Sequence, residues 1–297
     1  MTQIRSQGLH HNLVLADGSS WVIAAGDEES ISVISELCNA MQLAMTPGAG
    51  EAPHHGIVRH LRVQFDTLNP EGSPATCYAP LPSESNGFVV CALHPSARDH
   101  APSAKLRRLS LIIARDAQTR GAVLLHGALA ERNGNGVILA APSGTGKTTA
   151  SNRFPAPWNS LSDDATLVVM DRQGNYWAHP WPTWSRFLWG RSGGSWKVQN
   201  AVPLKGIFFL AQALEDRVER VGYGQAVTLL VHCAAQVSQL MERGLGKEES
   251  RTLRLNRFNN LCALTQVVPV HVLQISLSGT FWQEIERVLE GNDREKT

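Results

Sequence analysis

The sequence has no excess of either charge, because its 27 basic and 26 acidic side chains leave a formal net charge of +1 over 297 residues. A chain this close to neutrality has no global field to draw nucleic acid or an anionic membrane onto it. It also lacks any apolar run near the ~18 residues that a membrane span needs. Its first twelve residues are polar, with no apolar signal core. These absences predict a cytoplasmic protein without nucleic-acid or membrane partners.

The cysteines lack the spacing of a zinc or redox site. No two of them have the two-residue gap of a Cys-x-x-Cys pair, and their number is odd. Both facts argue for free, mostly buried thiols in a reducing compartment. The cysteines are Cys38, Cys77, Cys91, Cys233 and Cys262.

What is present is the composition of an ordinary globular protein, with 43% hydrophobic and 18% charged residues. Residues 1–100 mix short strand patterns, one helical pattern and loops rich in Pro, Gly and Ser, which predicts a small N-terminal α+β section. Its role would be acceptor recognition or simple packing. Residues 101–297 combine strands and helices, which predicts an α/β domain.

Local patterns place the elements of both sections. In the first, strands are predicted on either side of an Asp17–Gly18 turn, over 58–65 and over 87–93, with a helix over 28–45. In the second, the apolar runs 123–129 and 137–141 flank an Asn-Gly-Asn-Gly turn and predict paired antiparallel strands. Further helices are predicted over 104–117, 226–241 and 283–289, and strands over 202–210 and 270–277.

The segment 141–148 reads Ala-Pro-Ser-Gly-Thr-Gly-Lys-Thr and lies between a strand pattern and a helix pattern. Glycines free the backbone amides to converge on phosphates, and a helix that begins there favours an anion. Lys147 supplies a charge for the outer phosphates and Thr148 a hydroxyl for magnesium. The segment therefore predicts a P-loop, although Ala141 replaces the usual first glycine and Pro142 has no amide to donate. The alternative is a glycine-rich helix start with a chance lysine.

Two adjacent carboxylates, Asp163 and Asp164, follow Lys147 by 16 and 17 residues and precede an apolar strand. In phosphoryl transfer one carboxylate would serve Mg²⁺ while the other accepts the proton of an attacking hydroxyl. The alternative is a turn in which aspartate caps the backbone. At this distance from a phosphate loop we favour the functional interpretation.

Histidines and tryptophans leave alternatives open. His126 lies in an apolar strand pattern, where a core histidine is as good an interpretation as a functional one. His54 and His55 lie in a loop without a matching carboxylate or thiol, so we expect them to be exposed rather than metal ligands. An aromatic stretch would be either a groove for a peptide or a base, or core of a β-rich section. It contains Trp158, Trp177, Trp181, Trp184, Trp189 and Trp196, with the cations Arg186, Arg191 and Lys197.

Taken in chain order, His126-Gly127, the segment 143–148 and Ser162-Asp163-Asp164 resemble the HPr kinase/phosphorylase family. The segments around Trp184, 190–194 and 203–210 resemble a divergent branch of that family, which includes the ScmC proteins of SynChlorMet cassettes. The resemblance implies a phosphoenolpyruvate-carboxykinase-like P-loop fold. It also implies ATP- and Mg²⁺-dependent transfer of a phosphoryl group to a serine or threonine of a peptide or small protein, and often a homo-oligomer.

The resemblance also implies roles for individual residues. The phosphates would lie on Ser143, Gly144, Thr145, Gly146, Lys147, Thr148 and Thr149. Thr148 and Asp164 would serve Mg²⁺, Asp163 would be the general base, His126 would lie beside the acidic pair, and Arg191 would match the arginine of the family's Glu-x-Arg-Gly segment.

The sequence departs from the family pattern at several of its motifs. Trp189 stands where the family has the glutamate of Glu-x-Arg-Gly, and Ser162 stands where it has alanine. We therefore carry two alternatives to a peptide kinase: a small-molecule kinase, and a non-catalytic ATP-binding scaffold of a peptide-modifying complex.

Overall fold

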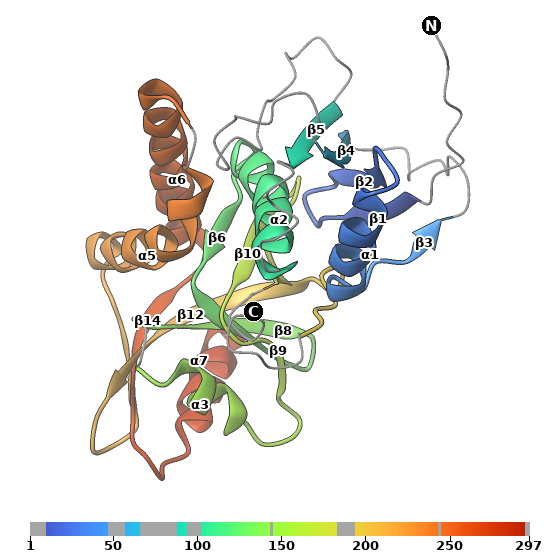
Figure 1. Cartoon of the computed structure of the whole chain (residues 1–297). Coiled ribbons are helices and arrows are strands. Elements are labelled where there is room, and N and C mark those ends of the chain that lie inside the picture. Colours follow the sequence, from blue (N-terminus) through green and yellow to red (C-terminus); the bar gives the residue numbers. More distant parts are fainter. Residues whose placement is uncertain are drawn as a thin grey trace, which may run out of the picture.

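The structure is a computed structural model that combines two sheets with flanking helices (Figure 1). This mixed α/β architecture with open sheets agrees with the predicted class. No helix among the described residues is both long and apolar enough to cross a membrane. The described residues are 10–46, 57–65, 88–93, 102–142, 145–182, 194–242 and 245–294.

The first sheet has five strands in the order β3-β1-β2-β4-β5. The predicted hairpin at its centre is confirmed: β1 and β2 are antiparallel, and Gly18 turns the chain with a φ of 81°. The Asp17 carboxylate accepts a hydrogen bond from the Ser19 amide at 2.8 Å, which closes the turn. The strands are β1 (His10–Val14), β2 (Ser20–Ala25), β3 (Met45–Thr46), β4 (Val58–Phe65) and β5 (Phe88–Leu93).

Helix α1 (Ser30–Ala40) belongs to this section, and α2 (Pro102–Gln118), the first helix after it, packs against α1. The helix predicted over 28–45 is too long at its C-terminal end. Gln42 takes a left-handed φ of 51°, which ends the helical path and leads the chain into β3. Helix α1 packs its apolar face against β2, β4 and α2.

The second sheet has nine strands, ordered β6-β10-β11-β12-β8-β7-β9, with β14 beside β12 and β13 beside β14. The predicted antiparallel pairing of β7 with β8 is confirmed. Strands β8, β12 and β14 are parallel, so their carboxyl ends lie at one edge. The strands are β6 (Val123–Leu125), β7 (Gly127–Arg132), β8 (Asn135–Ala140), β9 (Asn159–Ser162), β10 (Thr166–Met170), β11 (Tyr176–Pro180), β12 (Val202–Gln212), β13 (Arg217–Arg220) and β14 (Val270–Ile275).

Helices cover both faces of this sheet (Figure 1). Ile138 and Ala140 of β8 face the core formed with α5 and α6, whereas Val137 and Leu139 face the core formed with α3 and α7. This alternation follows from the two-residue repeat of a strand. The elements are α3 (Lys147–Asn152), α5 (Tyr223–Ser238), the 3-10 turn η2 (Gln239–Met241), α6 (Lys247–Val267), which was not predicted, and α7 (Phe281–Arg294).

A third core connects the two sheets. The fully buried Trp21 of β2 and Trp181, which follows β11, belong to the same apolar cluster. Leu167 and Val169 of β10 join it from the second sheet. The first sheet therefore packs directly on the strand that follows the acidic pair.

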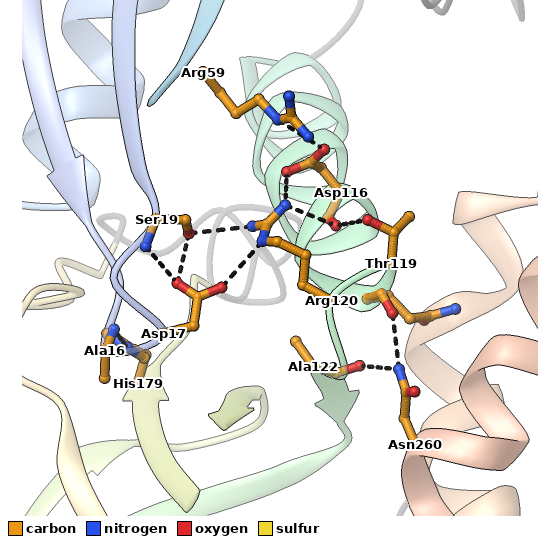
Figure 2. A network of polar contacts seen from close by, with 11 residues as sticks. Ala16, Asp17, Ser19, Arg59, Asp116, Thr119, Arg120, Ala122, His179 and Asn260 are labelled. Carbon is orange, nitrogen blue, oxygen red and sulfur yellow. Dashed lines mark hydrogen bonds and ion pairs between the residues drawn. The ribbon is translucent and has the colours of Figure 1, made fainter. Parts of the chain in front are cut away.

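A polar network reinforces this junction (Figure 2). Arg120, just after α2, donates to the Asp17 carboxylate at 3.2 Å and to the Ser19 hydroxyl at 3.1 Å. Its guanidinium also pairs with Asp116, which in turn pairs with Arg59 of β4 at 3.4 Å. Each carboxylate thus has a cationic partner.

His179 of β11 extends the junction at its buried end. Its Nε2 accepts the amide of Ala16 at 3.1 Å, so its Nδ1 carries the proton and donates to the Val198 carbonyl at 2.6 Å. Burial lowers the pKa of His179 and keeps the ring neutral. On the other side of the network, Asn260 of α6 donates to the Gln118 and Ala122 carbonyls at 2.8 and 3.0 Å.

Candidate functional site

The site lies where a strand ladder is interrupted. Strand β6 pairs with β10 as far as Leu125 and Thr166, and β7 pairs with β9 from Leu129 and Ser162 onward. Between these two pairs the ladder stops, although the chain continues on both sides. Where a ladder is interrupted, backbone groups are left out of regular strand pairing and the directions of the side chains change. His126 lies on one side of this gap and the acidic pair on the other.

At the interruption, two side-chain hydroxyls bond backbone groups of the facing strand, and a glycine leaves room for close packing. The Thr166 hydroxyl donates to the Gly127 carbonyl at 3.0 Å, and the Ser162 hydroxyl accepts the Leu129 amide at 3.3 Å. A Cβ atom on Gly127 would lie 2.6 Å from the Ile138 side chain, so only glycine fits. The His-Gly and Ser-Asp-Asp motifs therefore meet across one gap.

Three predicted site residues form a continuous chain of contacts inside this gap. The ammonium of Lys147 lies 2.9 Å from Nε2 of His126, and Nδ1 of His126 lies 3.2 Å from a carboxylate oxygen of Asp164. Lys147 and His126 are largely buried, with relative exposures of 7% and 13%, whereas Asp164 is 35% exposed. The chain therefore begins in the protein interior and ends at the surface.

Burial dominates the electrostatics of all three groups. It lowers the pKa of Lys147 and raises the pKa of Asp164, each partly opposed by the charge of the other. Burial also lowers the pKa of His126, and the Lys147 charge adds to this effect while Asp164 opposes it. A neutral imidazole that accepts from Lys147 on Nε2 and donates to Asp164 from Nδ1 satisfies both contacts.

The predicted P-loop enters from β8 and ends at α3. Gly146 takes a φ of 103° immediately before the helix, a conformation that side chains disfavour. The carbonyl of Thr145 accepts a hydrogen bond from Gln212 at 3.5 Å. Thr148 and Thr149 are exposed on the first turn. Ser143 and Gly144 lie outside the described residues.

The departure at Ala141 has a structural counterpart. Ala141 is buried, and its carbonyl accepts a hydrogen bond from the Lys147 ammonium at 2.9 Å. The Pro142 carbonyl lies 3.5 Å from the same nitrogen. Lys147 is thus folded back onto the strand end and His126.

Thr148 and Asp164 are the residues predicted to serve Mg²⁺. Thr148 and Asp164 offer the oxygen atoms that Mg²⁺ prefers. The described residues contain no group of three His, Cys, Asp or Glu side chains that could hold a metal ion alone. This is compatible with an ion that keeps water and substrate phosphate oxygens among its ligands. Arg191 lies outside the described residues.

Two residues of the site had no motif to reveal them. Arg107 of α2 acts on Asp164: burial raises the pKa of that carboxyl, and the charge of Arg107 is among those that oppose the rise. Cys233 of α5 donates its thiol to the His126 carbonyl at 3.2 Å, and burial raises its pKa to about 12. Only folding brings these helices to the gap.

The described part of the aromatic stretch contributes to the core and not to a groove. Trp158, Trp181 and Trp196 are buried, and Trp177 is partly buried. Trp184 and Trp189 lie outside the described residues, as do His54, His55 and Cys77. The four described cysteines are free thiols, and three of them are buried.

Comparison with protein families gives a match that covers most of the chain. A family model described as SynChlorMet cassette protein ScmC matches residues 89–290. The matched span begins in β5, ends in α7 and contains the whole gap. No curated protein matches the chain.

Proposed function

The chain belongs to the SynChlorMet cassette protein ScmC family, and we propose that it is a P-loop kinase of the HPr kinase type. Such a kinase transfers the γ-phosphoryl group of ATP to a hydroxyl of a peptide or small protein. The observation that carries the proposal is the contact chain of Lys147, His126 and Asp164. It links the phosphate loop to the acidic pair, which are the two parts that phosphoryl transfer requires.

Nucleotide binding would begin at the loop of Thr145 to Thr148. Backbone amides at the start of α3 would face the phosphates. The ammonium of Lys147 contacts the Ala141 carbonyl and His126, and the residue as a whole is 7% exposed. A phosphate is a stronger partner for an ammonium than a carbonyl is, so the bound nucleotide would draw Lys147 outward.

Thr148 and Asp164 would hold Mg²⁺ together with phosphate oxygens and water. When bound, the ion would neutralise charge on the phosphates and orient them for attack. His126 would hold Asp164 in place through the 3.2 Å contact, so that the exposed oxygen atoms of this carboxylate face the nucleotide side.

The acceptor hydroxyl would attack the γ-phosphorus while the bond to the bridging oxygen of ADP breaks. Asp163, which is partly exposed at the mouth of the gap, would accept the hydroxyl proton. Arg107 approaches the pair from α2 and would stabilise negative charge on that side. The N-terminal section, whose helix α1 packs against α2, would then lie beside this site and could present the acceptor.

The test is to measure ATP binding and ATP turnover with Mg²⁺, comparing the wild type with Lys147→Ala. We expect magnesium-dependent binding to weaken about 100-fold or more in the variant, because the loss removes a charge-assisted contact with phosphate. Turnover should fall with it. Arg287→Ala, which changes an exposed cation of α7, is the control and should behave as the wild type.

The outcomes separate the competing functions. Binding without turnover towards any peptide, metabolite or water would favour a non-catalytic ATP-binding scaffold. Turnover with small alcohols but not with peptides would favour a small-molecule kinase. Equal ATP affinity in wild type and Lys147→Ala would contradict a phosphate site at this loop.

A further inference from the structure

The edge beside the P-loop is uneven, because two strands extend beyond the third. Ala140, the last residue of β8, pairs with Phe209 of β12, which is level with Val272 of β14. Strands β12 and β14 continue together to Gln212 and Ile275. Three further residues of strand carry these two strands about 10 Å past the start of the P-loop. They form a wall along one side of it.

The loops that follow these two strands are tied to each other. The Asp216 carboxylate accepts the Ser276 amide at 2.6 Å, and the Ala213 amide donates to the Ile275 carbonyl at 3.0 Å. Gly279 is packed so closely that a Cβ atom there would lie 2.0 Å from the Asp216 carboxylate. The segments 213–216 and 276–279 therefore behave as one unit at the top of the wall.

The same unit is anchored to the P-loop and its helix. Arg153, directly after α3, donates to the Ser276 carbonyl at 2.8 Å and to the Gly279 carbonyl at 2.5 Å. At the other end, Gln212 donates to the Thr145 carbonyl at 3.5 Å. The two loops lie at the α3 end of the molecule, away from α6 (Figure 1). Their position relative to the predicted phosphate loop is thus fixed.

Each loop presents a leucine to solvent. Leu214 and Leu277 are both 98% exposed, the highest values among the exposed large apolar side chains of the described residues. A single exposed leucine needs no explanation. Two of them on loops that are tied together and anchored beside a nucleotide loop indicate a contact surface for a bound molecule.

We propose that Leu214 and Leu277 form an apolar clamp for the base of the nucleotide whose phosphates the P-loop holds. The inference rests on the proposed function. Strand β14 lies two strand spacings from β8, about 10 Å to the side, so ribose and base would extend from the P-loop along the wall to the leucines. The flat apolar face of a base suits aliphatic side chains.

The clamp has a consequence for base selection. Leucine side chains have no hydrogen-bonding groups, so these two contacts would hold adenine and guanine equally well. The two leucines should therefore contribute to affinity without choosing between ATP and GTP.

The experiment compares ATP, GTP and inorganic tripolyphosphate as ligands, each with Mg²⁺, by isothermal titration calorimetry. The test protein is the double variant Leu214→Ser/Leu277→Ser of the full chain. The matched control is Leu255→Ser, because Leu255 is 57% exposed and belongs to α6, which lies away from the two loops (Figure 1). Since the changed side chains are exposed, the thermal unfolding midpoint should stay within about 2 °C of the wild type.

We expect ATP and GTP to bind the double variant about tenfold more weakly, because apolar burial against the base is lost. Tripolyphosphate, which has no base, should bind wild type and variant equally. Unchanged ATP affinity would overturn the clamp, and so would an equal loss for tripolyphosphate. Failure of all three ligands to bind the wild type would instead contradict the proposed function.

Discussion

The molecule contains two partly buried polar clusters of similar composition that differ in how their charges are matched. In the network between the sheets, Arg120 lies between Asp17 and Asp116, and serine hydroxyl and backbone groups complete the pairing. In the gap, the Lys147 ammonium contacts a backbone carbonyl and a neutral histidine, His126. The Asp164 carboxylate contacts the other side of that histidine. In the first cluster the cation contacts two carboxylates directly, whereas in the second a histidine lies between the cation and the carboxylate.

Under the proposed function, this difference separates a cluster that serves folding from one that serves chemistry. A matched buried charge is costly to disturb because its partners are left uncompensated. A poorly matched one already bears a desolvation penalty, which the depressed pKa of Lys147 reflects. Perturbed ionisation near a predicted phosphate loop is the pattern expected of a functional site.

The largest effect should come from Asp163→Asn. Asparagine keeps the shape of the side chain but cannot accept the proton, so the transfer rate should fall about 10²- to 10⁴-fold. ATP affinity and thermal stability should stay close to wild type, because Asp163 is only partly buried and asparagine has nearly the same shape. Single-turnover transfer from radiolabelled ATP provides the rate. An unchanged rate would remove Asp163 from its role as general base.

The next prediction compares the loss of stability when the basic side chain of each cluster is removed. Arg120→Ala leaves two carboxylates without their shared partner and should lower the free energy of unfolding by about 3 kcal/mol. Lys147→Met replaces a poorly matched ammonium with an apolar stem and should change it by less than about 1 kcal/mol. Urea titrations at pH 7.5 measure both.

The nucleotide affinities of the same two variants should show the opposite order. Arg120→Ala should bind ATP as the wild type does below its unfolding transition, whereas Lys147→Met should not. Equal losses of stability in both variants would contradict the distinction between a folding cluster and a functional one.

The smallest effect concerns pH and the buried end of the junction. Burial lowers the pKa of His179 below its ordinary value of 6.5, so the unfolded chain takes up a proton that the folded chain refuses. Stability is then complete above pH 6.5 and falls as the pH drops below it, by at most about 1.4 kcal/mol per pH unit for one proton. His179→Gln should flatten this fall in urea titrations between pH 5 and pH 7.5.

His126 and His271 also contribute to the pH dependence of stability, because burial lowers their pKa values too, that of His271 to about 4. A residual slope is therefore expected in His179→Gln. An identical slope in variant and wild type would mean that burial of His179 does not favour the neutral ring over the protonated one.

Local patterns predicted the elements with a regular repeat and failed where distant contacts decide. The hairpin of β7 and β8 and the strands β12 and β14 follow from alternation and turn residues. Helix α6 was missed because Arg257, with 12% of its side chain exposed, interrupts the apolar stripe between the buried Leu253 and Leu261. The charge of Arg257 is matched by Glu242, which follows η2 and lies 15 residues earlier in the chain. A partner at that separation is invisible to a pattern that spans one or two helical turns.

The candidate site was predictable in its motifs but not in its geometry. The P-loop, His126 and the acidic pair each carry a local signal. The single strand predicted over 123–129 is wrong, because the ladder partner changes from β10 to β9 at His126. Arg107, Cys233 and the two exposed leucines have no local signal, since only the packing of distant elements places them beside the site.

The interrupted ladder limits how the chain can change in length. Adjacent residues of β10 face different cores: Leu167 and Val169 lie in the core between the sheets, and Val168 lies in the core under α5 and α6. Removing one residue from the gap before β10 would exchange these faces along the whole strand. Substitutions in the gap keep the register of β10, whereas insertions and deletions change it. Evolution can therefore alter the side chains of the gap more readily than its length.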